Sequence, residues 1–395
     1  MRLSDKALSI SPSLTLDITA KANRMRKSGI NVIGFGAGEP DFDTPDYIKE
    51  AAISAIKEGY TKYTPTSGIL ELKEAIVQKL KRDNNLSYDV SQIVVSNGAK
   101  QAIFNTLCAI LNQGDEVIIP SPYWLSYPEM VKLAGGVPVF IDTAESNNFK
   151  ITATQLEEAI SDKTKAIIIN SPNNPTGAVY NEEELKNIAS LAVKHNIYVI
   201  SDEIYEKLIY NGKHVSIASF NEEIKNLTII INGMSKAYSM TGWRIGYSVS
   251  NPEIAKLINN IQSHTTSNPN TIAQYASVTA LNQGDDTIKT MVVEFKRRRD
   301  YMLQRINKID GLKAIPPDGA FYIIINISNF IGTEIDETKI NGSIAFANFL
   351  LEKAKVAVIP CLPFGNDNYI RVSYATSMKN IEEGFNRIEN LLTNF

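Results

Sequence analysis

AIIINSPNNPTGAVYNEEELKNIASLAVKHNIYVISDEIY, residues 166–205, shows how this chain is built. Residues 166–170 form a short apolar run of the kind found in buried strands, and residues 198–201 form another. Between them, the apolar positions of residues 182–194 have the spacing of a helix. A strand, a helix and a strand in this order predict two parallel strands joined by a crossover helix.

The same alternation continues on both sides of this stretch. The predicted strands are residues 93–95, 116–119, 137–141, 166–170, 198–201, 228–232 and 246–249. The predicted helices are residues 100–111, 127–134, 154–160, 182–194 and 251–263. Alternating strands and helices predict an α/β fold with a mostly parallel sheet that helices cover on both faces, a three-layer α/β/α arrangement.

The pattern changes after about residue 285. A long charged helix is expected first, then a mixture of strands and helices: residues 285–306, 320–327, 343–354, 369–374 and 380–392. The helix at residues 14–27 and the strand at residues 32–35 fit with this part. We therefore expect a large domain over residues 45–284, and a smaller α+β domain in which residues 1–44 join residues 285–395.

Composition excludes several classes of protein. The chain has 395 residues, 44% of them hydrophobic and 21% charged, with a formal net charge of −3, as in an ordinary globular protein. This charge offers no basic field for nucleic acid. The short basic blocks at residues 24–27 and 296–299 are expected to be solvated helix faces. Two cysteines far apart in sequence suggest neither a disulfide framework nor a CxxC metal site.

The sequence contains no membrane or export signal that we can identify. No run of 18 apolar residues is present, so no membrane span is expected. The first residues, MRLSDKALSISPS, lack the apolar core of a signal peptide. We therefore expect a cytoplasmic protein.

Polar side chains follow the fourth, fifth and sixth predicted strands. Asn174 follows the fourth strand, Asp202 and Tyr205 follow the fifth, and Lys236 follows the sixth. Ligands bind at the carboxyl ends of the strands in open α/β sheets, so these groups are expected to converge on one crevice. A lysine beside a core is a candidate for a lowered pKa and for Schiff-base chemistry.

A candidate anion site lies at the start of the helix that follows the first strand of this sheet. Gly98 and Ala99 precede the body of that helix. Free backbone N–H groups at a helix N-terminus attract anions, and small residues let a phosphate approach them.

Other known ligand-binding and catalytic motifs are excluded, because the chain lacks residues that they require. Residues 34–40 begin like a dinucleotide-binding loop, but Glu39 replaces the third glycine and Pro40 breaks the continuation. Residues 233–237 end in alanine and so miss the GxSxG motif, and no GxxxxGK[ST] motif is present. The three histidines are too scattered in sequence to predict a metal site or a hydrolase triad.

The chain resembles the fold-type-I pyridoxal-phosphate aminotransferases, and most closely the prokaryotic-type aspartate aminotransferases. The resemblance covers nearly the whole chain. It is carried by the motifs at residues 36–42, 63–68, 97–101, 122–124, 171–177, 201–205, 232–246 and 369–373. Each motif is moderately specific, whereas their order and spacing together are highly specific.

The resemblance implies roles for the residues at the strand ends. Lys236 would carry pyridoxal 5′-phosphate and move a proton during the reaction. Asp202 would pair with the nitrogen of the cofactor ring. Asn174 and Tyr205 would hydrogen-bond the ring oxygen, and Trp124 would stack on the ring. Pro175, after Asn174, would be a cis proline.

The resemblance also implies residues that hold the phosphate and the substrate. The further cofactor-binding residues would be Gly98, Ala99, Lys100, Ser235 and Arg244, with Tyr63 reaching in from the second subunit of a homodimer. Arg371 would bind the substrate α-carboxylate as a bidentate pair, assisted by the backbone near Gly38. Trp124 and Asn174 would also contact the substrate.

The choice of substrate depends on a departure from the animal-type enzymes. Those enzymes bind the distal carboxylate with an arginine of the second subunit, and residues 263–269 hold no arginine. The prokaryotic-type set, here Lys100, Ser13 and Thr15, is expected to bind that carboxylate instead. Enzymes with this set often also accept prephenate.

The leading hypothesis is a ping-pong transamination between aspartate and 2-oxoglutarate, with pyridoxamine phosphate holding the amino group. The alternatives within the class are an alanine, aromatic or kynurenine aminotransferase, or a β-lyase. A pyridoxal-phosphate-binding regulator ranks below these, because the chain is mildly acidic and begins with the catalytic-type segment. An NAD-dependent oxidoreductase ranks lowest, because its loop motif fails.

Overall fold

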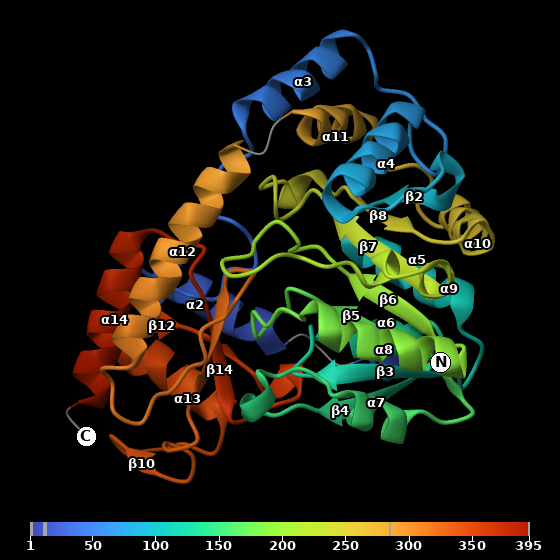
Figure 1. Cartoon of the computed structure of the whole chain (residues 1–395). Helices are drawn as coiled ribbons and strands as arrows, with labels where there is room; N and C mark the ends of the chain where they lie inside the picture. Colours follow the sequence, from blue (N-terminus) through green and yellow to red (C-terminus); the bar gives the residue numbers. More distant parts are fainter. Residues whose placement is uncertain (1–2, 11–13, 284–285, 394–395) are drawn as a thin grey trace.

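The computed structural model describes residues 3–10, 14–283 and 286–393. Its centre is a seven-stranded sheet with the strand order β2-β8-β7-β6-β5-β3-β4 (Figure 1). The strands are β2 (Ile93–Ser96), β3 (Glu116–Ser121), β4 (Val137–Asp142), β5 (Thr164–Asn170), β6 (Tyr198–Asp202), β7 (Thr228–Gly233) and β8 (Gly246–Val249). Strands β4, β3, β5, β6 and β7 are mutually parallel, and β8 runs antiparallel to both of its neighbours. The predicted mostly parallel sheet is confirmed.

Helices cover both faces of this sheet because its central strands are apolar on both sides. Ile168 and Ile200 pack on one face, whereas Ile167 and Val199 pack on the other. The first face is covered by α5 (Ala99–Ile110), α6 (Ser126–Leu133) and α10 (Pro252–Ser263). The second is covered by α7 (Ala153–Ala159), α8 (Glu182–His195) and α9 (Glu222–Leu227). This three-layer arrangement follows from the period-two alternation of side chains along each buried strand.

Local signals delimit the crossover helix α8. Its first residue follows a capping box, in which Asn181 accepts from the backbone of Glu184 and Glu184 accepts from the backbone of Asn181. Its end is marked by Asn196, which has a left-handed backbone with φ of 52°. These signals set the length of the helix between β5 and β6.

The C-terminal part has a small antiparallel sheet of its own, in the order β13-β14-β9. Its strands are β9 (Tyr322–Asn326), β13 (Ile359–Pro360) and β14 (Tyr369–Ser373), and its helices are α12 (Asp286–Ile306), α13 (Ser343–Phe349) and α14 (Met378–Leu392). The N-terminal strand β1 (Ile33–Gly34) pairs in parallel with β12 (Val356–Ala357), and α2 (Leu14–Lys27) packs nearby. Strand β1 and helix α2 therefore join the C-terminal part, whereas α1 packs against α6 of the large part. The division at residues 44/45 and 284/285 stays a prediction.

Several elements were not predicted from the sequence. They are α1 (Asp5–Leu8), α3 (Asp46–Lys57), α4 (Leu70–Asn84), α9, α11 (Thr271–Asn282), β10 (Glu334–Ile335), β11 (Thr338–Lys339), β12 and β13. The predicted helix at residues 343–354 is α13 followed by a π-helical turn, Leu350–Ala354. The predicted strand at residues 320–327 is shorter at both ends. Helix α3 packs on α11 above the sheet (Figure 1).

The prediction of a solvated face for the basic block at residues 296–299 is wrong for two of its arginines. Arg298 and Arg299 are buried on α12. Arg298 pairs with Asp41 at 2.7 Å and with Glu294 at 2.9 Å, and Arg299 donates to the carbonyl of Pro317 at 2.9 Å. Asp41 and Pro317 lie on other segments, whereas Glu294 lies one turn earlier on α12, so the sequence of the block alone did not reveal the burial.

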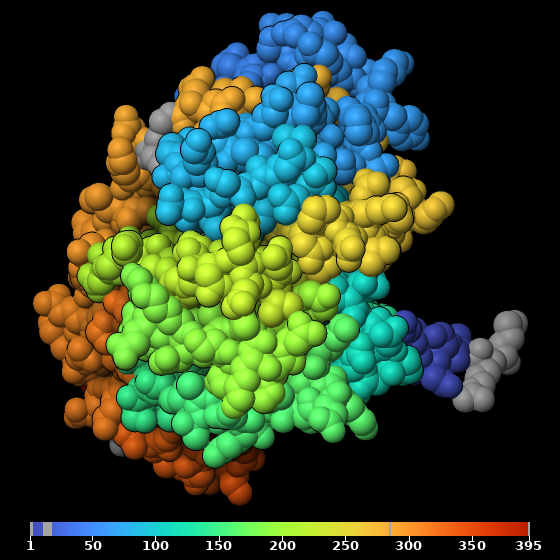
Figure 2. All heavy atoms as spheres, turned by 45° about the vertical axis from the view of Figure 1, so that its right-hand side comes forward, coloured from blue at the N-terminus to red at the C-terminus, as the bar shows by residue number. Residues whose placement is uncertain are grey.

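The surface has one projecting element. Figure 2 shows α1 standing out from the side of the molecule, and Leu3 and Leu8 are 70% and 65% exposed. Among the described residues, no helix combines the length and the apolar character needed to cross a membrane. The expected absence of a membrane-spanning helix therefore holds for this part of the chain.

Candidate active site

A cavity of about 720 Å³ lies at the carboxyl ends of β5, β6 and β7. Its opposite wall comes from the N-terminal segment and from the small sheet. The predicted site residues that line it are Gly38, Ala99, Lys100, Trp124, Asn174, Asp202, Tyr205, Ser235, Lys236, Arg244 and Arg371. The parallel topology explains this convergence, because adjacent parallel strands end at the same edge of the sheet.

Lys236 lies just beyond β7 and points into the cavity. Its ammonium group donates to the carbonyl of Gly38 at 2.5 Å. Burial lowers the pKa of Lys236 to about 8; Glu39 opposes this shift, whereas the charges of Arg371 and Arg244 add to it. The side chain is therefore a primary amine that is in part neutral near neutral pH.

Asp202, the last residue of β6, is a buried carboxylate. Tyr127 donates its hydroxyl to Oδ2 of Asp202 at 2.6 Å, and the backbone N–H of Ile204 donates to Oδ1 at 3.2 Å. Burial raises the pKa of Asp202 to about 6, although both hydrogen bonds oppose the rise. A cation placed beside this carboxylate would lower that pKa again.

Tyr127 is a site residue that the sequence did not reveal. Burial and the neighbouring Asp202 raise the pKa of Tyr127, so its hydroxyl stays protonated and donates. Its ring lies edge-on to Trp124, with the centroids 5.3 Å apart. Tyr127 lies on α6, whereas Trp124 precedes that helix, and no pattern in the sequence marked Tyr127 as a site residue.

Arg371, on β14, is buried without an acidic partner among the described residues. Its Nη1 donates to Oδ1 of Asn174 at 2.9 Å, and its Nη2 donates to the carbonyl of Gly36 at 3.2 Å. Its Nε has no hydrogen-bond partner in the described part of the chain. The guanidinium lies over the ring of Tyr322, 4.3 Å from the centroid. A buried cation with only neutral oxygens around it is suited to receive a carboxylate.

Hydrogen bonds hold the neighbours of Arg371 in place. The Asn174–Pro175 peptide is cis, as predicted. The backbone N–H of Asn174 donates to Oδ1 of Asn170 at 2.8 Å, and the hydroxyls of Tyr205 and Tyr322 are 3.0 Å apart. Tyr322 was not identified from the sequence, because a tyrosine in an apolar strand is indistinguishable from a core residue.

The start of α5 has a geometry suited to an anion, and we call this part of the site the anion cradle. Gly98 has φ of +86°, and a Cβ there would lie 2.4 Å from Nη2 of Arg244. A Cβ at Gly246 would lie 2.2 Å from the backbone nitrogen of Ala99. Arg244 donates to the carbonyls of Thr241 and Asn97 at 2.9 and 3.1 Å. The glycines therefore bring a guanidinium against free N–H groups at a helix start, which is an arrangement suited to phosphate.

Lys100 lies at the edge of the cavity beside Trp124. Its ammonium group is 4.9 Å from the centroid of the Trp124 ring. Burial lowers the pKa of Lys100, and the charge of Arg244 lowers it further. A cation at this edge is available to an anionic group at the far end of a substrate.

Two predicted residues do not line the cavity, and two others have no described side chain. Gly98 lies next to the lining residue Ala99 but is not itself part of the lining. Tyr63 is 91% exposed and does not line the cavity. Ser13 lies outside the described residues, and only the backbone of Thr15 is described, as part of α2. Later residues of α2, including Ile18 and Ala22, do line the cavity.

The site therefore contains three groups around one space: an amine that is partly neutral, a buried carboxylate, and an anion cradle. This set fits a phosphorylated aromatic aldehyde with a basic ring nitrogen. The amine would form the covalent link, the carboxylate would face the ring nitrogen, and the cradle would bind the phosphate.

Comparison with known proteins agrees with this chemistry. The sequence profile of the family described as aminotransferase class I and II matches residues 30–388. Among curated relatives, the aspartate aminotransferase of Bacillus sp. (strain YM-2) is 51% identical over 388 residues, which are 98% of each chain. The probable aspartate/prephenate aminotransferase of Aquifex aeolicus (strain VF5) is 49% identical over 393 residues, covering 99% of this chain and 98% of the relative.

Solved structures give the same result. The aspartate aminotransferase of Rhizobium meliloti superposes with a TM-score of 0.97 at 42% identity, covering 100% of this chain and 99% of that one. The Thermus thermophilus aspartate aminotransferase with maleate gives a TM-score of 0.94 at 42% identity, covering 99% and 100%. The predicted fold class and the resemblance are confirmed.

Proposed function

We propose, because this chain belongs to the aminotransferase class I and II family, that it transfers the amino group of aspartate to 2-oxoglutarate, giving oxaloacetate and glutamate. The observation that carries this proposal is the position of Lys236 in one cavity with Asp202, Arg244 and Arg371. The names of its relatives support aspartate as the amino donor, and several of them also include prephenate. We include prephenate as a candidate substrate for the same site.

The residues of the cavity fit pyridoxal 5′-phosphate as the cofactor. When bound, this cofactor supplies an aldehyde that takes up the amino group and a ring that withdraws electrons. Gly98, Ala99, Ser235 and Arg244 would hold its phosphate, and Trp124 would stack on its ring. Asn174 and Tyr205 would donate to its ring oxygen.

Asp202 would keep the ring nitrogen protonated. Its carboxylate is buried, its orientation is held by Tyr127, and it has no cation bonded to it in the described part of the chain. A protonated ring nitrogen would supply that cation and offset the cost of burying the carboxylate. The Asp202 charge is therefore most stable in the cofactor-bound site.

Lys236 would first hold the cofactor and then move the proton at the substrate Cα. With a pKa of about 8, roughly a tenth of the amine is neutral at pH 7 before any substrate binds. That pKa is close to the operating pH, which suits a group that both accepts and donates a proton. Its hydrogen bond to Gly38 directs the amine across the cavity.

Arg371 would bind the substrate α-carboxylate, and Lys100 would bind the distal one. A carboxylate would give the unpaired Nε of Arg371 a partner, and a bidentate pair is stronger than its present bonds to neutral oxygens. Ser13 and Thr15 would assist Lys100, and this part of the proposal rests on the resemblance alone.

We further propose that the protein is a homodimer. Tyr63 is 91% exposed here, and it would reach the phosphate site of the second subunit. Large apolar side chains of α3 and α1 are also exposed, among them Ile56 at 53% and Leu8 at 65%. A second subunit would cover such groups. The cytoplasmic location stays a prediction.

An absorption spectrum tests the covalent part of the proposal. The reconstituted protein should show the band of the bound cofactor, and aspartate should convert it to the pyridoxamine form. Lys236→Ala should abolish turnover, whereas Lys186→Ala, an exposed control, should not. A colourless protein after reconstitution, or full turnover in Lys236→Ala, would contradict the proposal.

A panel of amino donors with 2-oxoglutarate tests the substrate. Aspartate should have the highest kcat/KM. A higher value for alanine, kynurenine or an aromatic amino acid, or release of ammonia and pyruvate as in a β-lyase, would replace aspartate transamination with the corresponding reaction. Prephenate is tested as an acceptor in the same assay.

A further inference from the structure

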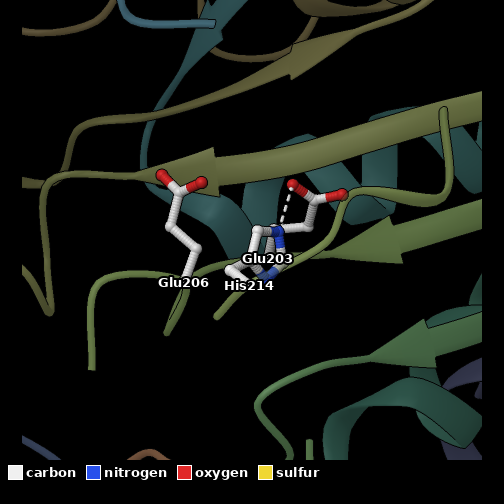
Figure 3. A group of neighbouring side chains, drawn as sticks. All are labelled: Glu203, Glu206 and His214. Atoms are coloured by element: carbon white, nitrogen blue, oxygen red, sulfur yellow. Dashed lines mark hydrogen bonds and ion pairs between the residues drawn. The ribbon is translucent and has the colours of Figure 1, made fainter. Parts of the chain in front are cut away.

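A second group of charged side chains is buried behind the segment that carries Asp202 and Tyr205. Figure 3 shows three of them, with the His214 imidazole beside the Glu203 carboxylate and Glu206 to one side. Their side chains are 9%, 1% and 7% exposed. Lys79 of α4, 2% exposed, completes the group, which we call the rear cluster. Buried charges in such number need partners, and the structure provides them except at Nδ1 of His214, which has no hydrogen-bond partner in the described part of the chain.

Glu203 is bonded on both carboxylate oxygens. Ser201 and Ser216 donate to Oε1 at 2.9 and 2.6 Å, and Nε2 of His214 lies 3.0 Å from Oε2. Side chains alternate between the two faces along β6, so Ser201 and Asp202 project to opposite sides. Glu203 bonds to Ser201 and so lies on the side away from the cavity.

Glu206 is bonded on both oxygens as well. It forms an ion pair with Lys79, and Asn232 donates to the same oxygen at 2.9 Å. Asn84 donates to the other oxygen at 3.1 Å and accepts from Lys79 at 2.8 Å. The cluster therefore joins the end of α4, the turn after β6, and β7.

The rear cluster has ligand types that could bind a metal ion, but its bonding argues against one. Glu203, Glu206 and His214 have ligand atoms within 4.8 Å of one another. However, all four carboxylate oxygens already accept from donors, and the Lys79 ammonium lies against Glu206. A metal ion would have to displace a buried cation and break these bonds.

The cluster bonds directly to the chain segments that carry the proposed catalytic groups. Glu203 follows Asp202, and Glu206 follows Tyr205. The backbone N–H of Glu203 donates to the carbonyl of Ile231 at 2.9 Å, which ties the turn to β7 ahead of Lys236. The Glu206–Asn232 bond makes a second tie between the same two segments.

We propose that Glu203, Glu206, Lys79 and His214 are positioning residues that hold Asp202, Tyr205 and Lys236 in their working geometry, and that the positive charge of His214 is part of this function. The proposal rests on the proposed function, because it assigns a purpose to groups that do not touch the cavity. It also explains why four charges are buried where an apolar core would suffice.

The charges of the cluster balance only when His214 is protonated. Glu203 and Glu206 then face Lys79 and His214, two negative and two positive groups. Burial lowers the pKa of His214, but the charge and hydrogen bond of Glu203 and the charge of Glu206 outweigh it, so the net pKa is raised. Loss of the proton leaves an excess negative charge behind Asp202, whose own pKa the Glu203 charge raises.

The remaining titratable groups around the cluster do not replace the His214 charge. They are Tyr88, Tyr247, Asp83 and Lys207. Burial and the Glu203 charge raise the pKa of Tyr88, and burial and the Glu206 charge raise that of Tyr247, so both stay neutral. Asp83 forms ion pairs with both Lys207 at 3.0 Å and Arg82 at 2.8 Å, so these charges are engaged with one another.

The decisive variant is His214→Gln, which retains a donor for Glu203 but cannot be charged. His195→Gln, at an exposed position on α8, is the matched control. In the holoenzyme, we expect kcat for aspartate to fall about 10- to 100-fold with KM changed less than about twofold, as for a misplaced catalytic group. The midpoint of the pH titration of the bound cofactor absorbance should shift by about 0.5 pH unit. The control should change neither.

A readout without turnover accompanies these measurements. Titration of the apoprotein with pyridoxal phosphate should show weaker binding for His214→Gln than for wild type. Ser216→Ala, which removes one bond to Glu203, is a milder variant that serves if His214→Gln does not fold; it should shift the same quantities in the same direction.

The outcomes are separable. Unchanged kcat, cofactor affinity and absorbance midpoint in both cluster variants, with only a lower Tm, would overturn the positioning role and leave a structural one. If EDTA removed the activity and Zn²⁺ restored it, the rear cluster would be a metal site and the positioning proposal would be wrong. A wild-type protein that neither binds pyridoxal phosphate nor transaminates would overturn the proposed function together with this inference.

Discussion

Asp202 and Glu206 are buried carboxylates four positions apart on one turn, and they differ in how their charge is stabilised. Asp202 faces the cavity with two hydrogen-bond donors and no bonded cation in the described chain, and its pKa is raised to about 6. Glu206 faces away from it with Lys79 against it; burial acts to raise its pKa, but the charges of Lys79 and His214 lower it. The carboxylate on the rear side of the turn therefore already has a counter-ion, whereas the carboxylate that faces the cavity has none among the described residues.

Asp202→Asn gives the largest expected effect. We expect kcat for aspartate to fall about 10³-fold, because an amide cannot supply the negative charge proposed to face the ring nitrogen. The free energy of unfolding of the apoprotein should change by less than about 1 kcal/mol, since no cation is left unpaired. Steady-state kinetics and urea unfolding measure these. Asp162→Asn, on the surface, is the control; a kcat above a tenth of wild type in Asp202→Asn would break the comparison.

Glu206→Gln should act on stability instead. Removal of this charge leaves the Lys79 ammonium buried without a counter-ion, so the apoprotein should lose about 3–5 kcal/mol of unfolding free energy. Urea unfolding measures the loss. Glu222→Gln breaks an exposed pair with Lys225 and should cost less than about 0.5 kcal/mol. Equal losses in the two variants would show that the Glu206 charge contributes no more than a surface charge.

Lys100→Ala tests the cavity side of the comparison, where Lys100 is proposed to bind the distal carboxylate of the substrate. The kcat/KM for aspartate should fall roughly 30-fold, because the distal carboxylate loses its partner. This loss corresponds to about 2 kcal/mol of transition-state stabilisation. The value for alanine, which has no distal carboxylate, should change less than about twofold. A competition assay with both donors measures the ratio. Parallel losses for both donors would remove Lys100 from substrate choice and leave it with the cofactor.

The pH dependence of His214 gives the smallest expected effect. Its folded pKa lies above the ordinary 6.5, so the stability it contributes is fully present below pH 6.5 and is lost as pH rises through the folded pKa. The difference in unfolding free energy between wild type and His214→Gln should therefore be about 1 kcal/mol larger at pH 6 than at pH 9. A difference that is constant or larger at pH 9 would contradict the charged state.

In the turn after β6, the sequence predicted Asp202, which faces the cavity, better than Glu203 and Glu206, which face the rear cluster. Runs such as residues 166–170 identify buried parallel strands, and strand ends carry ligands, so pattern could single out Asp202 and Lys236 as candidates, whereas their roles came from the family resemblance. Glu203 and Glu206 have the same local pattern as solvated residues. Lys79, the partner of Glu206, lies on an amphipathic helix far away in sequence, and only the tertiary fold buries it.

The same limit explains the other omissions. Tyr127 and Tyr322 look like core residues in sequence, because a hydroxyl partner across the fold leaves no periodic signal. Helices α3, α4 and α11 lie before and after the run of strands on which the sequence interpretation depended. The two buried arginines of α12 were taken for surface residues, because a block of basic residues is usually solvated.

The pairing of β1 with β12 has a consequence for synthesis on the ribosome. Residues 33–34 emerge from the ribosome about 320 residues before their partners at residues 356–357. At about 5–20 residues per second, the apolar run around Phe35 waits for roughly 15–60 s before it can be covered. The wall of the cavity that includes Gly36 and Gly38 is therefore completed after the strands of the central sheet have been synthesised, and nascent chains that stall before residue 356 would expose this segment to chaperones and proteases.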